Sequence, residues 1–531
     1  MKPAPAGDLA LVLHAHLPFL RHPEHRYHLE ENWLYEAIAA TYLPLCEVFQ
    51  NLARGGVRLR VTMSMSPTLV SMLQDDLLRE RASSYLDRLV LLGEQELVRT
   101  RREPALFKLA NFYHDRFRRL RALYHAEDGD IPAAFRRLED QGFVELITVG
   151  ATHGFQPTIL EPAARRAQLE IAAEVHRDAF GRSPRGIWLP ECGYVPGVDE
   201  DLAELGIRYF FVDTHGVEHA RPRPPFGVAA PIYTKSGVAV FGRDKESSRQ
   251  VWSADDGYPG DPLYRDFYRD IGFDLPLDVI GPFVHPDGIR VHTGFKYHRV
   301  TGKVDLGAKQ LYDPDRARDR AADHAGNFLG NRGAQIAWLA GRMDRRPIIV
   351  SPYDAELFGH WWFEGPQFLD FLFRKLHHDQ SIVRATTPSE FLAENPTQVV
   401  AEPAPSSWGE GGYSGVWIDG SNDWIYRHQH RAEARMVDLA SRHVGGAPTL
   451  IGRALDQAAR ELLLLQSSDW AFIMKTGTAT GYAASRVKAH AARFQRLCDE
   501  VEAARIDEAW LADLERRDNL FPGLDYRVYA R

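Results

Sequence analysis

Short apolar runs recur along the first 350 residues, and a polar or Gly/Pro-rich turn follows each of them. Between them lie sequences with a helical spacing of apolar positions, such as 163–180 and 198–206. This alternation of strand and helix predicts a mainly parallel sheet. We expect a βα barrel, and a doubly wound open sheet is the alternative, although no GxGxxG motif follows an early strand. The seven strand-like runs are 9–13, 57–63, 144–149, 186–189, 207–212, 237–241 and 347–350.

Two regions depart from this alternation. Residues 71–140 are charged and strongly helical, which predicts a helical insertion between strands. The segment 394–407 is rich in Pro and Ser and is typical of an interdomain connection, and helix-spaced apolar positions follow it. We therefore predict a catalytic barrel over residues 1–400 and a helical C-terminal domain over residues 401–531.

Composition indicates a globular protein with a sizeable core, since 44% of the 531 residues are apolar and 26% are charged. The net charge of −8, without long basic runs, argues against nucleic acid and membrane surfaces as partners. The first apolar run, 9–13, is too short for a signal peptide or a membrane span. Cys46, Cys192 and Cys498 are odd in number and far apart, which favours a reducing, cytoplasmic location. No oligomeric state is predicted.

Histidines follow two of the strand-like runs. His14 and His16 stand two apart after the first run, so both project to the same side if the strand continues, and His153 follows another run. Zinc would need a third and usually a fourth ligand, and no HExxH motif or Asp/His cluster stands nearby. We favour hydrogen bonding to a substrate, with zinc binding and a structural role as the alternatives.

Two carboxylates also follow very apolar runs, Glu191 in GIWLPECGY and Asp354 in PIIVSPYDAELFGHWWFEG. The structural alternatives are an acid at a helix N-terminus for Glu191 and a helix N-cap for Asp354. Together the two acids suit glycoside cleavage, in which one carboxylate attacks or stabilises the anomeric carbon and one carboxyl protonates the leaving oxygen.

Aromatic residues near these acids, and in a Gly- and Ser-rich segment near residue 410, favour a sugar substrate, because pyranose faces stack on flat rings. Aromatic residues are also ordinary core residues, but the segment SSWGEGGYSGVWIDGSNDW contains too much Gly and Ser for a core. The candidates are Trp361, Trp362, Trp408, Tyr413, Trp417 and Trp424.

At these residues the sequence resembles glycoside hydrolase family 57, and within it the α-1,4-glucan branching enzymes. The resemblance covers nearly the whole chain, and SPYDAELFGHWW alone is highly specific. It implies a (β/α)7 barrel with a helical insertion and an α-helical C-terminal domain that helps close the active site. The matching segments are HAHLPF (14–19), GATHGF (150–155), WLPECGY (188–194), SPYDAELFGHWW (351–362) and SSWGEGGYSGVW (406–417).

The resemblance also implies roles for individual residues. Glu191 would be the nucleophile of a retaining double displacement, and Asp354 would be the general acid/base. Branching enzymes of the family use a tyrosine on a mobile loop over the site, and Tyr233 in PIYTKSG is its expected counterpart. The alternative for Tyr233 is an aromatic residue packed at the start of the next strand. The further residues expected around the glucan are His14, His16, His153, Trp408, Trp417 and Asp469.

The predicted function is therefore branching: an α-1,4 bond of an α-glucan such as amylose or glycogen is cut, and the fragment passes to a 6-hydroxyl without a cofactor. A hydrolase or 4-α-glucanotransferase with the same carboxylates is the nearest alternative. A metal-dependent carbohydrate deacetylase and a non-catalytic glucan-binding protein are the others. The chain departs from the family at RYHLEE (26–31) and Pro262-Leu263, where tryptophans are common, and these departures bear on acceptor binding.

Overall fold

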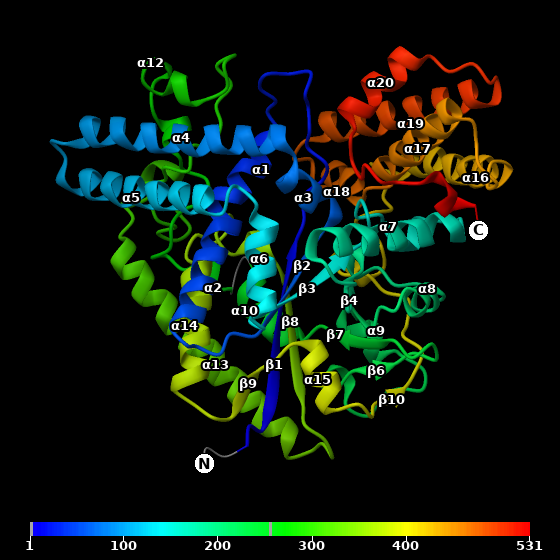
Figure 1. The fold of residues 1–531 in the computed structure, drawn as a ribbon. Coiled ribbons are helices and arrows are strands. Elements are labelled where there is room, and N and C mark those ends of the chain that lie inside the picture. Colours follow the sequence, from blue (N-terminus) through cyan, green and yellow to red (C-terminus); the bar gives the residue numbers. More distant parts are fainter. Residues whose placement is uncertain (1–3, 254–256, 531) are drawn as a thin grey trace.

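The computed structural model describes residues 4–253 and 257–530 (Figure 1). Seven parallel strands follow the order β7-β5-β4-β3-β2-β1-β8. Just past β7, the amide N–H of Asp244 donates to the carbonyl of Val350 in β8 at 2.9 Å, which links the two ends of this row. The fold is thus the expected (β/α)7 barrel. Its strands are β1 (Gly7–Ala15), β2 (Val61–Met65), β3 (Val144–Val149), β4 (Gly186–Trp188), β5 (Tyr209–Val212), β7 (Ala239–Gly242) and β8 (Ile348–Asp354).

Each predicted apolar run overlaps one of these strands, and the alternation along each strand fills the barrel. Ala10 and Val12 of β1 pack in the barrel interior with Val350 of β8. The odd-numbered leucines of β1 belong to the cluster under the outer helices. Because side chains alternate, the next inward position of β1 is His14. The β1–β8 register sets His14 beside Asp354, at the carboxyl end of the barrel.

Helices cover the outside of the barrel, and three short strands extend its sheet (Figure 1). The strand β6 (Ile232–Tyr233) is antiparallel to β7, β10 (Val399–Val400) pairs with β6, and β9 (Val383–Ala385) pairs with β1. The main covering helices are α2 (Leu43–Arg54), α3 (Pro67–Gln74), α7 (Pro162–Phe180), α8 (Val198–Glu204), α13 (Pro314–Ala340), α14 (Gly365–His378) and α15 (Pro388–Glu394).

The helical insertion is a long hairpin of α4 (Asp76–Thr100) and α5 (Pro104–Ala126), which lies beyond the strand ends in Figure 1. The next helix, α6 (Ile131–Asp140), packs instead against α2 and β3 as an ordinary barrel helix. Asp75 caps α4, and Asp130 caps α6, each by accepting a backbone N–H bond.

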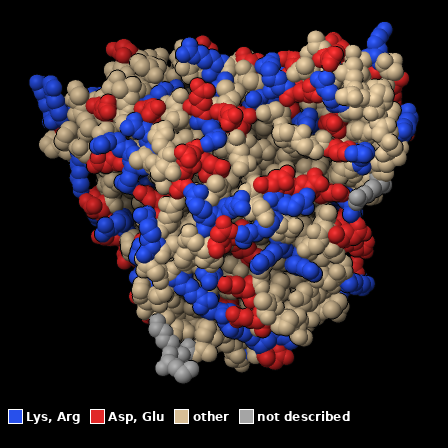
Figure 2. All heavy atoms as spheres, viewed as in Figure 1, with Lys and Arg blue, Asp and Glu red and all other residues tan. Residues whose placement is uncertain are grey.

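The C-terminal helices pack on one another and on one side of the barrel mouth (Figure 1). Among the residues described, no helix is both long and apolar enough to cross a membrane. On the face shown in Figure 2, basic and acidic side chains are interspersed. These helices are α16 (Tyr426–Arg442), α17 (Thr449–Leu465), α18 (Ser468–Thr476), α19 (Thr480–Glu502) and α20 (Glu508–Arg517).

Candidate active site

Glu191 stands on a tight turn directly after β4. Its backbone is left-handed, with φ 61°, and so is that of Cys192, with φ 51°. Non-glycine residues adopt this conformation rarely and at some energetic cost, so the surroundings must hold it. One such restraint is the amide N–H of Trp408, which donates to the Glu191 carbonyl at 2.8 Å. Glu191 does not lie at an α-helix N-terminus, because the next α-helix, α8, begins only at Val198.

The Glu191 carboxylate is 9% exposed, and both of its oxygens accept hydrogen bonds. The indole N–H of Trp408 donates to Oε2 at 2.8 Å, and the hydroxyl of Ser468 lies 2.8 Å from Oε1. Burial raises the pKa of Glu191 to about 7, the two hydrogen bonds oppose this rise, and the charges of Asp469 and Asp354 add to it. The carboxyl group therefore titrates near neutral pH.

Asp354 ends β8 and faces the same mouth of the barrel. It precedes a 3-10 turn, but its side chain makes no capping bond, so the N-cap alternative does not hold. Burial and the neighbouring Glu356 raise the pKa of Asp354 to about 7, although Arg243 and His16 lower it. Within residues 4–253 and 257–530, no donor forms a hydrogen bond with this carboxyl group. Unlike Glu191, Asp354 has no protein group that favours its ionised form by hydrogen bonding.

Glu356 is a third acid at this mouth, partly buried, and no pattern in the sequence assigns it a role. Its Oε1 accepts from the Tyr42 hydroxyl at 2.5 Å and from the amide N–H of His16 at 3.3 Å. Burial raises the pKa of Glu356 to about 7. A turn at Gly359 follows, with φ 119°, and an added Cβ there would meet the Ala40 carbonyl. Only glycine fits this turn, which explains the glycine within SPYDAELFGHWW.

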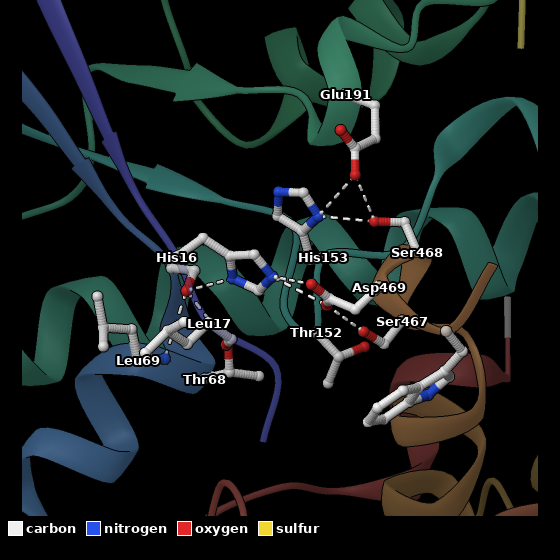
Figure 3. Close-up of polar contacts among 12 residues, drawn as sticks. His16, Leu17, Thr68, Leu69, Thr152, His153, Glu191, Ser467, Ser468 and Asp469 are labelled. Atoms are coloured by element: carbon white, nitrogen blue, oxygen red, sulfur yellow. Dashed lines mark hydrogen bonds and ion pairs between the residues drawn. The ribbon is translucent and has the colours of Figure 1, made fainter. Parts of the chain in front are cut away.

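The three predicted histidines lie together (Figure 3 labels two of them). His14 contacts Ser64 through Nδ1 at 2.8 Å and His153 through Nε2 at 3.0 Å. The Nδ1 atom of His153 lies 2.8 Å from Ser468 Oγ and 3.5 Å from Glu191 Oε1. Burial, with some help from neighbouring histidines, lowers the pKa of both His14 and His153 well below 6.5. Both rings are therefore neutral at neutral pH.

His16 forms the second part of this group. Its Nε2 lies 2.9 Å from Asp469 Oδ2, its Nδ1 lies 2.8 Å from Ser66 Oγ, and its ring stacks on that of His153 at 3.8 Å. Burial alone would raise the pKa of Asp469, but the contact with His16 and a bond from Ser467 hold it down at about 2. His16, His153 and Asp469 each offer a ligand atom within 4.8 Å of the others, so this is the one place at the barrel mouth where described residues are grouped for a metal.

The C-terminal helices supply part of the site. The start of α18 follows a bridge between Gly154 and Ser467, and the Ser468 amide N–H donates to the His153 carbonyl at 3.1 Å. These contacts bring Ser468 to Glu191 and Asp469 to His16, as Figure 3 shows. The sequence motif SSDW pointed to Asp469 but not to the adjacent serine.

Two of the predicted tryptophans expose ring surface near the mouth. Trp361 is 52% exposed and stacks on Phe267 with ring centroids 4.5 Å apart. No sequence motif pointed to Phe267, which lies beyond Pro262-Leu263, the residues that follow GYPGD. Trp408 is partly buried beside Glu191, where the guanidinium of Arg243 lies 5.7 Å from its ring centroid.

Trp417 differs from this expectation. Its ring packs against Phe155 at 4.9 Å and is 2% exposed, so it offers no open face to a sugar in this structure. The Gly- and Ser-rich segment that contains it therefore folds inward at this point. We assign Trp417 to packing rather than to glucan contact. Trp362 is likewise buried, whereas Tyr413 is exposed.

Tyr233 is not placed on a loop over the site. It pairs with Ala239, the first residue of β7. Ala239 is in register with Tyr209 of β5, and Tyr209 is in register with Gly186, the first residue of β4. Tyr233 therefore lies level with the start of β4. Glu191 lies beyond the opposite, carboxyl end of β4, on the turn that follows Trp188. The expectation of a lid tyrosine at Tyr233 is therefore wrong. The flanking Pro and Gly residues suggested a loop, but pairing with β7 and β10 makes this position a strand.

The model of the family described as "Glycosyl hydrolase family 57" matches residues 10–275, and that of "1,4-alpha-glucan branching enzyme, C-terminal" matches residues 428–529. A 1,4-alpha-glucan branching enzyme of Thermococcus kodakarensis is 35% identical over 97% of this chain and 77% of its own length. The chain belongs to glycosyl hydrolase family 57.

Solved structures superpose over nearly the whole chain. The alpha-amylase AmyC from Thermotoga maritima has 42% identity and a TM-score of 0.94, with 100% of this chain and 99% of AmyC covered. The branching enzyme from Pyrococcus horikoshii has 35% identity and a TM-score of 0.89, with 99% and 97% covered. The relatives with this fold therefore include an alpha-amylase and a branching enzyme.

Proposed function

We propose that this family 57 chain is a 1,4-α-glucan branching enzyme. It cleaves an α-1,4-glucosidic bond and transfers the released chain to a 6-hydroxyl of an acceptor glucan. The observation that carries this proposal is the pair of carboxyl groups at the ends of β4 and β8, the buried Glu191 and the partly buried Asp354, each with a pKa of about 7. The names of the curated relatives support branching as the outcome of that chemistry.

The different surroundings of the two acids support their roles. Glu191 accepts bonds from Trp408 and Ser468, which favour its ionised form, as a nucleophile requires. Asp354 lacks such bonds and has the charge of Glu356 nearby, which favours its protonated form, as a general acid requires. We therefore propose a retaining double displacement in which Glu191 bonds to the anomeric carbon and Asp354 protonates the leaving oxygen. Asp354, now ionised, then removes a proton from the incoming 6-hydroxyl.

The remaining polar and aromatic groups fit substrate binding. His16 and Asp469 are partly exposed and lie within hydrogen-bond distance of each other. We propose that they accept hydrogen bonds from the sugar held on Glu191 and donate hydrogen bonds to it. The stacked pair of Trp361 and Phe267 offers an open aromatic surface for a further glucose unit. Phe267 of this pair lies shortly after Pro262-Leu263, where this chain lacks the tryptophan that is common in the family.

Hydrolysis of α-glucans is a second candidate that two observations favour. AmyC, an alpha-amylase, is 42% identical to this chain, and Tyr233 lies on a strand rather than over the site. Water competes with the acceptor hydroxyl for the glycosyl-enzyme, so transfer requires a covered site and a positioned acceptor. Branching by this chain must therefore rely on groups other than Tyr233 to exclude water.

The deacetylase alternative finds little support in the histidine contacts. Every ring nitrogen of His14, His16 and His153 lies within 3.0 Å of a hydroxyl oxygen, a carboxylate oxygen or another of these ring nitrogens. A zinc ion would have to displace these bonds before it could be held. We propose catalysis without a metal. We also propose a role in glycogen metabolism and a cytoplasmic location, which the three buried, unpaired cysteines support.

Incubation with amylose tests the proposed function. Proton NMR measures new α-1,6 linkages, and a reducing-end assay on the same samples measures net hydrolysis. A branching enzyme forms α-1,6 signals with few new reducing ends, whereas a hydrolase forms reducing ends alone. Glu191→Gln serves as the inactive control. If reducing ends increase and no α-1,6 signals form, the function is hydrolysis and not branching.

A further inference from the structure

We propose that Ser64, His14, His153 and Ser468 form a hydrogen-bond chain of fixed direction that ends on Glu191, in which Ser468 is a positioning residue for the nucleophile. The successive distances are 2.8, 3.0, 2.8 and 2.8 Å. The inference rests on the proposed role of Glu191. It extends that role to two serines at the opposite ends of this chain of contacts, Ser64 on β2 and Ser468 on α18.

The Glu191 end of the chain sets one direction. An ionised carboxylate has no proton, so it only accepts, and the hydrogen of Ser468 must point at Oε1. Ser468 Oγ can then only accept from His153, which therefore carries its proton on Nδ1. Because His153 is neutral, its Nε2 is an acceptor. His14 must donate to it, and so carries its own proton on Nε2.

The far end sets the same direction independently. Ser64 is fully buried in β2, and in the described part of the chain its hydroxyl has one hydrogen-bond partner, Nδ1 of His14. If that nitrogen carried a proton, the hydroxyl hydrogen would be buried without an acceptor, which is unfavourable. Ser64 therefore donates to His14. Two separate arguments thus agree on the proton on His14 Nε2.

The contact between the two histidines excludes a fully charged pair. Two nitrogens 3.0 Å apart have room for one proton between them, so two Nε2–H groups cannot face each other there. Burial disfavours a charge on either ring. With both rings neutral, each has a single N–H, and the chain has one arrangement that satisfies every member.

The consequence is a donor that cannot turn away from Glu191. A serine hydroxyl ordinarily rotates, but the bond from His153 occupies the acceptor side of Ser468 and directs its hydrogen to Oε1. Such a bond to a charged group favours ionisation of a carboxylate that burial alone would protonate. The other charged or titratable groups that face Glu191 are Asp354 on β8, Asp469 on α18, His153 after β3, Cys192 on its own turn, and Arg243 behind Trp408.

Histidine tautomers test the direction without any substrate. In wild-type protein labelled with ¹⁵N-histidine, long-range ¹H–¹⁵N spectra, assigned by His14→Gln and His153→Gln, report which nitrogen carries the proton. We expect His14 with the proton on Nε2 and His153 with the proton on Nδ1. At pH 8, where Glu191 is ionised, the opposite tautomer at either residue, or a doubly protonated ring, would overturn the chain.

The pH profile tests the effect on Glu191. Ser468→Ala removes the donor, so the acid limb of kcat/KM should move up by about one pH unit, with about tenfold lower activity on that limb and little change on the alkaline limb. Ser468→Thr keeps the hydroxyl and should restore the wild-type limb. Ser389→Ala is the matched control, since this serine also bonds a buried glutamate, Glu145, but at the other end of the barrel.

A fall in activity by Ser468→Ala that is uniform across pH would show a merely structural role and overturn the positioning role. If Ser468→Ala does not fold, the wild-type tautomers still decide the question. Wild-type protein without glucan-cleaving activity would refute the proposed function, whereas active wild-type protein with the opposite tautomers would refute only this inference.

Discussion

The substitution Glu191→Gln should abolish turnover and yet stabilise the fold at alkaline pH. The loss of the attacking charge should lower kcat by several orders of magnitude, because a neutral amide does not form the glycosyl ester. The stability change has the opposite sign because the wild-type carboxylate is ionised in a buried position. A catalytic carboxylate in this setting is retained for function at the expense of stability.

The magnitude follows from the pKa of Glu191, which burial raises from 4.5 to about 7 in the folded chain. Folding therefore takes up a proton at Glu191 between these pH values, so the contribution of this residue to wild-type stability is fully present below pH 4.5 and is lost as pH rises through about 7. The full difference is on the order of 3 kcal/mol at about 1.4 kcal/mol per pKa unit. The amide introduced by Glu191→Gln replaces one acceptor by a donor opposite Trp408 or Ser468, which offsets about 1 kcal/mol.

The net gain at pH 8 is thus about 2 kcal/mol. A chain of 531 residues has an unfolding entropy of about 1.1 kcal/mol/K, so Tm should rise by about 2 °C at pH 8. At pH 4.5, where the wild-type carboxyl is protonated, only the lost hydrogen bond remains and Tm should fall by about 1 °C. Thermal scans at both pH values measure this reversal, with the exposed Glu200→Gln as a control that should show none. A variant less stable than wild type at pH 8 would refute the burial argument.

Three further substitutions probe separate parts of the site. Asp354→Asn should lower turnover of amylose by about 10²–10⁴-fold and turnover of an aryl maltoside with a good leaving group much less, because only the amylose leaving group needs protonation. Equal losses on the two substrates would exclude Asp354 as the acid. Trp408→Phe keeps the ring but removes the indole donor to Glu191, and should raise the acid limb of the pH profile by about one to two units, whereas an unmoved limb would contradict the bond. Tyr233→Ala should leave the ratio of α-1,6 linkages to reducing ends unchanged, and a fall in that ratio would contradict its position on a strand.

The sequence predicted the barrel because strand geometry depends on local apolar patterns. The parallel strands lie at the seven apolar runs, and Glu191 and Asp354 follow two of them. Acids in that position signal chemistry because a barrel interior excludes unpaired charge, so the first polar residue after an apolar strand lies at the mouth.

Other residues carried no comparable signal. Ser64 within VTMSM resembles an ordinary strand residue, and Ser468 becomes a partner of Glu191 only because a bridge from Gly154 brings α18 to the barrel. Tyr233 was misplaced for the converse reason, since sheet pairing outweighs the Pro and Gly content of the segment before it. Contacts between residues distant in the chain place Ser64 and Ser468, which local patterns do not encode, whereas Tyr233 is placed by a short antiparallel pairing with β7.

Trapping of the covalent intermediate tests the central claim most directly. In Asp354→Ala, α-maltosyl fluoride should still glycosylate the enzyme, because fluoride leaves without protonation, but the missing base should slow release of the sugar. Mass spectrometry of proteolytic peptides should then find one maltosyl unit on Glu191. An adduct on another carboxylate, or fluoride release with no adduct and a β-anomeric product, would contradict a double displacement through Glu191.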